Sequence, residues 1–486
     1  MLAKWRRYRA PSVSGRRRAL SKLAALATAI LPLTRPNASF ALASNSRSPG
    51  ARGRRITDMI GTNGWPGSAG DLAMWREMGL TWGRDSVGPG QPDSPREPMR
   101  VDRTGVQYNS ELPPILNRNN RNGVRSLLLL AYTPKWNASV PGDSKSAPVD
   151  VDAWKRYVDA VVRKYSAPPY NLRHFQIWNE AAGKLSGGQL QASFWHGPDF
   201  NENQKLSRPY ERAMQDYVER IHLPAARIIR SYNAYVVYGG WPDQGGLDNF
   251  RKWLEYRSPL YNERMLDQVD YIDTHYLPVR DLDPLYEQYV KHGPARGIWQ
   301  TEIGDTYMKD PHYLPRYFFE FAAWALDRDW NDPDKYLSMI YHWDGYDSFR
   351  LTHRGPPTRT YNISGRSLIV LCQTVAGSLQ RFPAPLAFGS DASGTALLSG
   401  SDIVIQVIAA AGWRSVTATG VKPSTANTAT VEMIDGLTGA MSARENIALT
   451  WKDATLNVRF KVPTEVNGPL AKPPSHLAYI VVRRTA

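Results

Sequence analysis

The feature that most constrains the fold is an alternation of short apolar runs with amphipathic stretches between residues 56 and 382. Eight runs have the length and apolar character of strands: Ile56–Gly61, Leu80–Asp85, Val124–Tyr132, Leu172–Glu180, Tyr235–Trp241, Val269–Tyr276, Gly297–Glu302 and Tyr336–Trp343. Apolar residues recur at helical spacing between them, in Ala69–Met78, Val151–Tyr165, Tyr210–Ser231, Pro284–His292 and Pro315–Leu326. Eight strands followed by helices predict an α/β (β/α)8 TIM barrel with insertions.

A doubly wound open sheet would show the same alternation. That fold would be favoured by a glycine-rich phosphate loop after the first strand, and the sequence has none there. The continuous apolar run Leu127–Leu130 is typical of a strand covered on both faces, as in a barrel.

The pattern changes after Pro383, where short alternating runs are separated by Gly, Pro, Ser, Asn and Asp. These runs are Ala396–Leu398, Asp402–Ile408, Ser415–Thr419, Thr430–Ile434, Thr455–Phe460 and Leu477–Val482. Long helical patterns are absent from this part of the sequence. Residues 383–486 are therefore predicted to form an accessory β-sandwich domain beside a barrel of residues 56–382.

The formal charge of +15 is concentrated at the N-terminus. Of the 60 basic residues, thirteen precede residue 56, and no acidic residue does. The rest of the chain is nearly neutral, so no nucleic-acid footprint is predicted. Arg16–Arg18, the apolar Leu23–Leu33 and the small Ala41–Ala43 follow the order of an export signal. We therefore expect a signal peptide at 1–43, a linker at 44–55, and a periplasmic or extracellular protein.

The segment Gly15–Lys22 resembles a bacterial twin-arginine signal, although Ala19 stands where that signal usually has an aromatic residue. The general secretory route is the alternative. The apolar centre is too short to span a bilayer, so no stable membrane insertion is expected after cleavage.

Cysteine and histidine usage narrows the chemistry. Cys372 is the only cysteine, which excludes an intramolecular disulfide and a thiolate-rich metal site. Among the nine histidines only His275 and His342 fall at predicted strand ends, too few for a full metal coordination set. No Gly-x-Ser-x-Gly elbow is present. The sequence predicts neither a metal nor another cofactor.

Two glutamates follow predicted strands at the end where barrel active sites lie. The fourth strand ends in Trp178-Asn179-Glu180, and the seventh ends in Thr301-Glu302-Ile303-Gly304. Cleavage of a glycosidic bond needs such a pair, with one carboxyl to protonate the leaving oxygen and one to attack or to activate water. The alternative is that each glutamate caps a helix or pairs with a surface arginine.

These motifs resemble clan A of the glycoside hydrolases, a group of retaining barrel glycosidases. The resemblance implies that Glu180 is the general acid/base and Glu302 the nucleophile. It also implies that Asn179 holds the 2-hydroxyl of the sugar and that Arg84, at the end of the second strand, pairs with the nucleophile.

Further residues match the clan at other strand ends. His275-Tyr276 resembles its His and Tyr pair, of which the Tyr hydrogen-bonds the nucleophile, and Trp343 matches a tryptophan that stacks on a sugar ring. Trp65, Trp136 and Trp241, near the ends of the first, third and fifth strands, would extend that platform or pack in the protein.

The segment Tyr132–Trp136 is similar to the third strand of glycoside hydrolase family 39, and Gly61–Asn63 agrees with it. That family includes β-xylosidases, α-L-iduronidases and endo-acting hydrolases of bacterial exopolysaccharide. We predict a secreted retaining hydrolase of a polysaccharide, endo-acting on a bacterial exopolysaccharide or a plant β-glycan. An exo-acting glycosidase such as a β-xylosidase and a non-catalytic glycan-binding matrix protein are the alternatives. Two insertions, Val87–Asn109 and Ala181–Pro209, are expected to wall the substrate site or to pack on the barrel.

Overall fold

A computed structural model describes most of the chain after residue 53. The described residues are 54–86, 99–101, 106–108, 112–181, 195–196, 210–241, 247–304, 310–328, 339–342, 350–353, 360–421 and 429–484. The predicted export signal and most of both insertions lie outside these ranges. None of the helices described is long and apolar enough to cross a bilayer.

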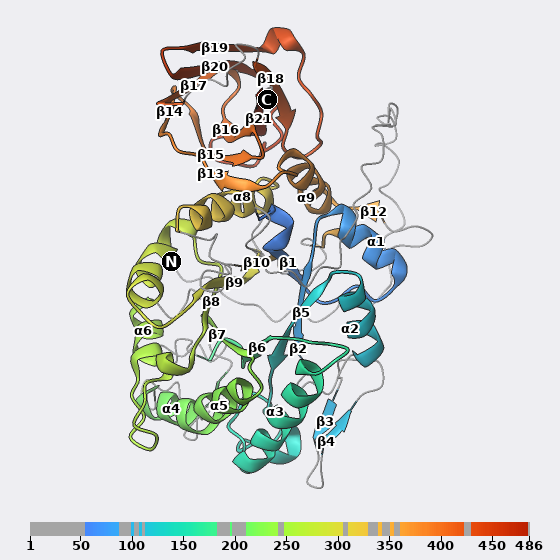
Figure 1. Ribbon diagram of the computed structural model, residues 1–486, viewed down its shortest axis with the longest axis vertical. Coiled ribbons are helices and arrows are strands. Elements are labelled where there is room, and N and C mark those ends of the chain that lie inside the picture. The colour runs from blue at the N-terminus through green and yellow to red at the C-terminus, as the bar shows by residue number, and fades with distance from the viewer. Residues whose placement is uncertain are drawn as a thin grey trace, which may run out of the picture. The chain divides into compact units, whose positions relative to one another are not determined.

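Eight parallel strands close into a barrel in the order β1-β10-β9-β8-β7-β6-β5-β2, as the sequence pattern predicts (Figure 1). They are β1 (Ile60–Asn63), β2 (Trp82–Ser86), β5 (Arg125–Leu130), β6 (His174–Ile177), β7 (Tyr235–Trp241), β8 (Tyr271–His275), β9 (Gly297–Ile303) and β10 (Met339–His342). The hydrogen-bonded circle is completed where β1 pairs with both β2 and β10. The short β3 (Met99–Val101) and β4 (Val106–Tyr108) form a separate antiparallel pair.

Helices cover the outside of the barrel (Figure 1). The α-helices are α1 (Ala69–Glu77), α2 (Leu112–Arg121), α3 (Val151–Ser166), α4 (Tyr210–Asp216), α5 (Leu223–Ser231), α6 (Leu247–Glu255), α7 (Asp283–Leu285), α8 (Tyr313–Leu326) and α9 (Ile363–Thr374). The shorter turns are 3-10 at η2 (Ile56–Asp58), η3 (Lys135–Asn137), η7 (Met265–Gln268) and η8 (Val279–Leu282), and π at η5 (Tyr217–His222) and η9 (Tyr286–Lys291). Side-chain caps define several starts; the Ser68 hydroxyl, for example, accepts from Asp71 N at 3.1 Å.

Several predicted elements differ from the structure, among them the predicted helix Pro284–His292, most of which is the π turn η9. The run Ile56–Gly61 begins as a 3-10 turn, because the Asp58 carboxylate accepts the backbone N–H of Arg55, so β1 starts only at Ile60. The predicted helix Tyr210–Ser231 contains the π turn η5 between α4 and α5. Pro224 has no N–H to give to the preceding turn, and the amide of Leu223 bonds instead to Val218 O, five residues back.

The end of the barrel at which its strands begin is filled by aromatic rings. Trp299 lies 5.1 Å from His174, 5.3 Å from Tyr271 and 5.6 Å from Trp82, measured between ring centroids. Burial lowers the pKa of His174 to about 3, so this ring is neutral and packs as an aromatic side chain. The interior at this end is a packed core and leaves the opposite end for chemistry.

The C-terminal region forms two antiparallel sheets, as predicted. One has the order β13-β15-β16-β21-β18 and the other β14-β17-β20-β19. Their strands are β13 (Leu379–Arg381), β14 (Leu386–Phe388), β15 (Ala392–Ser399), β16 (Asp402–Ala409), β17 (Gly412–Thr419), β18 (Ala429–Asp435), β19 (Ile447–Lys452), β20 (Thr455–Val462) and β21 (His476–Arg484). Because β13 pairs with β15, the sandwich begins before the predicted boundary at residue 383.

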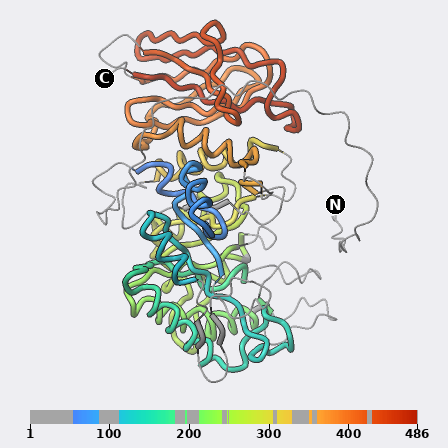
Figure 2. Tube along the Cα trace, turned by 90° about the vertical axis from the view of Figure 1, so that its right-hand side faces the viewer, coloured from blue at the N-terminus to red at the C-terminus, as the bar shows by residue number. Residues whose placement is uncertain are grey.

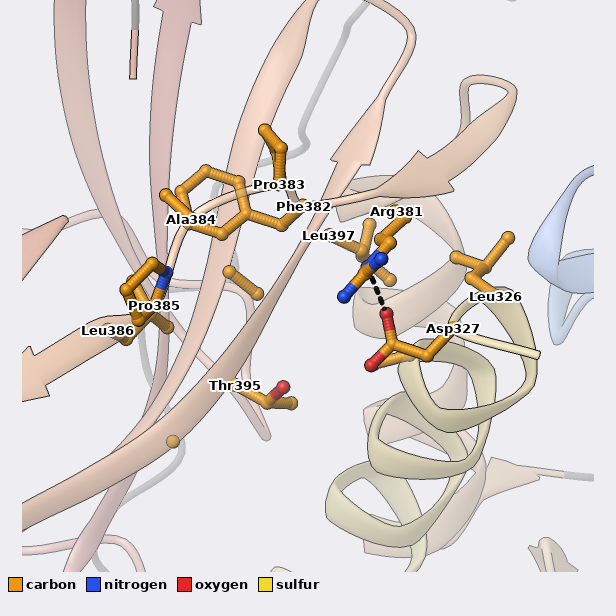
Figure 3. Close-up of a pocket in the computed structure, with 13 residues that line it drawn as sticks. Leu326, Asp327, Arg381, Phe382, Pro383, Ala384, Pro385, Leu386, Thr395 and Leu397 are labelled. Carbon is orange, nitrogen blue, oxygen red and sulfur yellow. Dashed lines mark ion pairs between the residues drawn. The ribbon is translucent and has the colours of Figure 1, made fainter. Parts of the chain in front are cut away.

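The first of these sheets packs on α8, and Figure 2 shows the red and orange strands beside the yellow and orange helical segments. The Phe319 and Tyr479 rings lie 5.9 Å apart, and Gln406 donates from Nε2 to Pro315 O at 3.1 Å. A cavity of about 450 Å³ opens at this contact, where Arg381 pairs with Asp327 at 2.7 Å (Figure 3).

Helix α9 packs back against the start of the barrel. The thiol of Cys372 is 8% exposed and donates to Met78 O at 3.4 Å. Burial raises the pKa of this thiol to about 12. Gly79 leaves no room for a side chain here, because a Cβ would stand 2.5 Å from the sulfur.

Candidate active site

Glu180 and Glu302 meet at the carboxyl ends of β6 and β9. A carboxylate oxygen of each and a ring nitrogen of His275 all lie within 4.8 Å of one another. Glu302 is part of β9 and 8% exposed, whereas Glu180 follows β6 in a left-handed conformation with φ 47°. Its amide is fixed by a 2.8 Å bond to Gly239 O. Left-handed backbone at a residue with a side chain costs free energy and is concentrated at functional sites.

Arg84 on β2 connects the nucleophile candidate to its surroundings. Its Nη1 donates to Glu302 Oε1 at 2.7 Å, and its Nη2 donates to Asn179 Oδ1 at 2.7 Å. Two further 2.7 Å bonds reach Asn63 Oδ1 and Gln176 Oε1. A buried guanidinium whose three nitrogens all donate hydrogen bonds is rigid, so the Glu302 carboxylate is held in one orientation.

Tyr276 holds the other oxygen of Glu302. Its hydroxyl donates to Glu302 Oε2 at 2.8 Å. Burial and the charge of Glu302 raise the pKa of Tyr276, so the phenol keeps its proton and remains a donor. The backbone turns at Tyr276, where φ is 56°, and this turn lets the adjacent His275 and Tyr276 both face the glutamates.

His275 bonds to the acid/base candidate. Its Nδ1 lies 2.8 Å from Glu180 Oε1, and its Nε2 lies 3.0 Å from Thr301 Oγ1. The ring passes directly over Gly240, where a Cβ would stand 2.5 Å from His275 Cε1. With φ +68°, Gly240 also has a backbone conformation that other residues adopt only with strain.

The environments of the two glutamates shift their pKa values in opposite directions. Burial alone would raise the pKa of Glu302, but the charges of His275 and Arg84 and the hydrogen bonds from Tyr276 and Arg84 lower it overall. For Glu180, burial and the charge of Glu302 outweigh its bond to His275 and raise the pKa. One ionised and one protonated carboxyl is the arrangement that acid/base catalysis by two carboxyl groups requires.

Several residues of this cluster were not singled out from the sequence as site residues. They are Asn63, Tyr132, Gln176, Gly240, Asp273 and Thr301. Tyr132 hydrogen-bonds Asn179, and burial with the charge of Glu180 raises its pKa. The sequence carries a signal for three of them, since Gln176, Asp273 and Thr301 are polar residues within predicted strands, and the structure buries all three fully.

The tryptophans behave differently from one another. Trp65 is 6% exposed and packs over Gly83, which fits the packing alternative for this residue. Trp136, in η3 after β5, is half-buried against the core. Trp241 ends β7, but its side chain lies outside the described residues, as does all of Trp343.

The part of the second insertion that is described is a packing element. Trp195 is fully buried, with its ring 5.2 Å from that of Trp178 and its Nε1 donating to Ala213 O at 2.9 Å. The burial of Trp195 fits the packing alternative for this insertion, with the ring supporting the strand end that carries Glu180.

Glu180, His275 and Glu302 are also residue types that bind metal ions. Both oxygens of Glu302 are already engaged, by Arg84 and Tyr276, and the Arg84 charge repels a cation. This donor set favours a hydrogen-bonded pair of carboxyl groups over a metal centre.

Comparisons with known proteins show the fold. Neither the profiles of known protein families nor the curated protein sequences match this chain. Among solved structures, a family 30 endoxylanase from Clostridium papyrosolvens C71 has a TM-score of 0.53 at 16% identity, over 89% of this chain and 97% of that one. A glycoside hydrolase family 30 subfamily 8 xylanase from Clostridium acetobutylicum has a TM-score of 0.52 at 15% identity, with the same coverages. A family 39 glycoside hydrolase from the gut symbiont Bacteroides cellulosilyticus WH2 has a TM-score of 0.45 at 11% identity, over 88% of this chain and 82% of that one.

Proposed function

We propose that this protein is a retaining glycoside hydrolase that cleaves O-glycosidic bonds in a polysaccharide by double displacement. The observation that carries the proposal is the approach of Glu180 and Glu302, with carboxylate oxygens within 4.8 Å. Retaining enzymes hold their two carboxyl groups about 5–5.5 Å apart, whereas inverting enzymes hold them about 6.5–9.5 Å apart to admit a water molecule. The opposite pKa shifts of the pair support Glu180 as the acid/base and Glu302 as the nucleophile.

In the first step the ionised Glu302 attacks the anomeric carbon of the sugar. The glycosidic C–O bond breaks as Glu180 gives its proton to the departing oxygen, and a glycosyl ester forms on Glu302. In the second step Glu180, now a carboxylate, takes a proton from a water molecule whose oxygen attacks the same carbon. Glu302 leaves as a carboxylate, and two inversions restore the original configuration.

The surrounding residues orient these groups. Arg84 and Tyr276 each donate to one oxygen of Glu302, which fixes the carboxylate and keeps it ionised between turnovers. Asn179 accepts from Arg84 through Oδ1, so its amide nitrogen is turned to donate. We assign this nitrogen to the 2-hydroxyl of the bound sugar, a contact that strengthens in the transition state.

We propose an endo-acting enzyme on a bacterial exopolysaccharide or a plant β-glycan. Two of the similar solved structures, with TM-scores of 0.53 and 0.52, are named a family 30 endoxylanase and a family 30 xylanase, which makes xylan the first polymer to test. An exo-acting glycosidase such as a β-xylosidase uses the same pair of carboxyl groups and is the competing proposal. Membership of clan A, and of family 39 in particular, remains a prediction from the motifs, as does export directed by residues 1–43.

The test is the release of reducing ends from a panel of polysaccharides, with Glu302→Gln measured in parallel. Xylan, glucans, mannans, glycosaminoglycans and bacterial exopolysaccharides form the panel. We expect one polymer to yield oligosaccharides with the natural chain and none with the variant, and the product lengths separate endo from exo action. Binding of a polymer by both proteins without cleavage by either would instead support a non-catalytic glycan-binding protein.

A further inference from the structure

Behind His275 lies a buried carboxylate that the two-carboxyl mechanism does not use. Asp273, two residues earlier on β8, is completely buried. Its Oδ1 accepts the backbone N–H of Thr301 at 2.9 Å, and its Oδ2 accepts the Thr301 hydroxyl at 2.7 Å. Asp273 Oδ2 also lies 3.5 Å from His275 Nε2. Thr301 directly precedes the nucleophile candidate, so this carboxylate ties β8 to the part of β9 that carries Glu302.

These bonds determine where the protons lie in the hydrogen-bonded series from Asp273 through Thr301 to His275. A carboxylate only accepts hydrogen bonds, so the single proton of the Thr301 hydroxyl points to Asp273. The Thr301 oxygen must then act as the acceptor toward His275 Nε2, 3.0 Å away, and Nε2 carries a hydrogen. The other ring nitrogen, Nδ1, faces Glu180 Oε1 at 2.8 Å. The charge on the ring decides whether Nδ1 donates a proton to this oxygen or accepts one from it.

The groups packed around the His275 ring favour its doubly protonated, cationic form. Facing it are Glu180 after β6, Thr301 and Glu302 on β9, Asp273 and Tyr276 on or after β8, and Gly240 on β7. Burial would lower the pKa of His275, but the charges of Glu302 and Asp273 and the bonds to Asp273 and Glu180 raise it to about 10. At neutral pH the ring therefore carries hydrogen on both nitrogens.

We propose that Asp273, acting through Thr301, is a positioning residue that keeps His275 doubly protonated, so that His275 donates to Oε1 of Glu180 and the acid proton stays on Oε2. This inference rests on the proposed hydrolase function. A neutral ring would accept the proton of Glu180 at Nδ1 and hold it away from the departing oxygen. With the cation in place, the proton lost from Glu180 Oε2 goes to the leaving group, and the carboxylate formed is stabilised by the N–H of His275.

The first measurement needs no substrate. In the full chain with 15N-labelled histidine, the ring signals of His275 are identified among the nine histidines by their loss in His275→Gln. We expect both ring nitrogens of His275 to remain protonated at pH 8 in the natural chain. In Asp273→Asn the amide can donate to Thr301, whose hydroxyl then turns to His275 Nε2, and the ring should become neutral at that pH. A ring that stays doubly protonated in Asp273→Asn overturns the proposal.

The second measurement follows activity on a polymer that the natural chain cleaves. Asp273→Asn should lower kcat/KM by about a hundredfold, the scale of general acid catalysis, and spare substrates with an activated leaving group. The alkaline limb of the pH dependence of kcat/KM in this variant should move to higher pH, because loss of the His275 charge raises the pKa of Glu180. A purely structural role would lower activity on both substrates and leave the alkaline limb in place, which contradicts the proposal.

Matched variants separate the effect of the hydrogen-bonded relay from Asp273 through Thr301 to His275 from a general loss of stability. Asp270→Asn removes another buried carboxylate just before β8, where it pairs with Arg230 and Arg296, and should change neither the His275 signals nor the pH limb. Thr301→Ser keeps the bridging hydroxyl and should leave both ring nitrogens of His275 protonated at pH 8, whereas Thr301→Val should give the neutral ring expected in Asp273→Asn. This pair carries the test if Asp273→Asn does not fold. If the histidine signals behave as expected but no polymer is cleaved, the hydrolase function fails while the relay stands.

Discussion

At the scale of single residues, the site combines groups that would be unstable alone. Arg84 and Glu302 form a buried ion pair, which is stabilised by further hydrogen bonds from Arg84 to Asn63 and from Tyr276 to Glu302. His275 and Asp273 add a second positive and a second negative group beside it. The two glutamates thus differ in protonation because of their neighbours, although both are buried carboxyl groups of the same type.

The opposite pKa shifts predict a bell-shaped pH dependence of kcat/KM. Activity requires Glu302 ionised and Glu180 protonated. It should therefore fall as the pH drops through the pKa of Glu302, below the ordinary 4.5, and fall again as the pH rises through the pKa of Glu180, above 4.5. Initial rates from acid to alkaline pH, with folding checked at each end by circular dichroism, test this. A single acidic limb would be inconsistent with the assignment of Glu180.

Replacing the acid should affect substrates unequally. Glu180→Ala removes the proton donor, so we expect a loss of about a hundredfold or more on a natural polymer and a much smaller loss on an aryl glycoside that needs no acid. Added azide should restore turnover and give a glycosyl azide with the configuration of the substrate, as established by proton NMR. An azide of inverted configuration would rule out a covalent intermediate on Glu302.

At the scale of secondary structure, the strand ends place the chemistry and glycines leave room for it. Gly240 allows the end of β7 to approach the His275 ring, and Gly239 supplies the carbonyl that fixes the amide of Glu180. At these two positions the backbone, and not a functional side chain, determines the geometry of the site. A small residue at a strand end is therefore as significant here as a charged one.

Gly240→Ala tests this contact. The new Cβ would stand 2.5 Å from His275 Cε1 and would also impose strain at φ +68°, so we expect at least a tenfold loss of activity and a destabilisation of about 1–3 kcal/mol. Gly400→Ala is the matched control, because its φ is +63° and nothing lies within 4 Å of the added atom. Equal effects of both substitutions on activity would show that backbone strain alone matters.

Comparison of sequence and structure at this scale separates what periodicity can predict from what it cannot. The barrel strands and the glutamates at their ends follow from apolar runs and the rule that active sites lie at strand ends. The late start of β1 and the π turn at η5 depend on a side-chain cap and a proline, which periodicity does not register. The bonds of Asp273 and Thr301 depend on strand register, which a single sequence does not specify.

At the scale of the whole molecule, the barrel and the five-stranded sheet share one hydrophobic core. Phe319 of α8 belongs to the same buried cluster as Leu397, Val404 and Tyr479 of the sheet. The opposite face of that sheet packs on the four-stranded sheet in a second cluster, which includes Ile405 and Val458. The sandwich thus completes the barrel on one side and has a core of its own on the other.

Shared burial predicts cooperative unfolding. We expect residues 44–486 to give one calorimetric transition, and a chain that ends at residue 378 to lose solubility or stability because it exposes the apolar face of α8. Tyr479→Ala should lower the temperature of that same transition, at a cost of about 3–5 kcal/mol for a buried aromatic residue. Two separate transitions, with only one moved by Tyr479→Ala, would mean that barrel and sandwich fold independently.

The position of Cys372 gives this molecule an intrinsic reporter of its own opening. The thiol is the only one in the chain, is buried where α9 meets the start of the barrel, and is hardly ionised at neutral pH. A thiol-specific reagent should therefore modify the folded protein only when this junction separates. The labelling rate, read by mass spectrometry without any engineered probe, would follow how often the barrel loosens and how far a bound oligosaccharide suppresses that loosening.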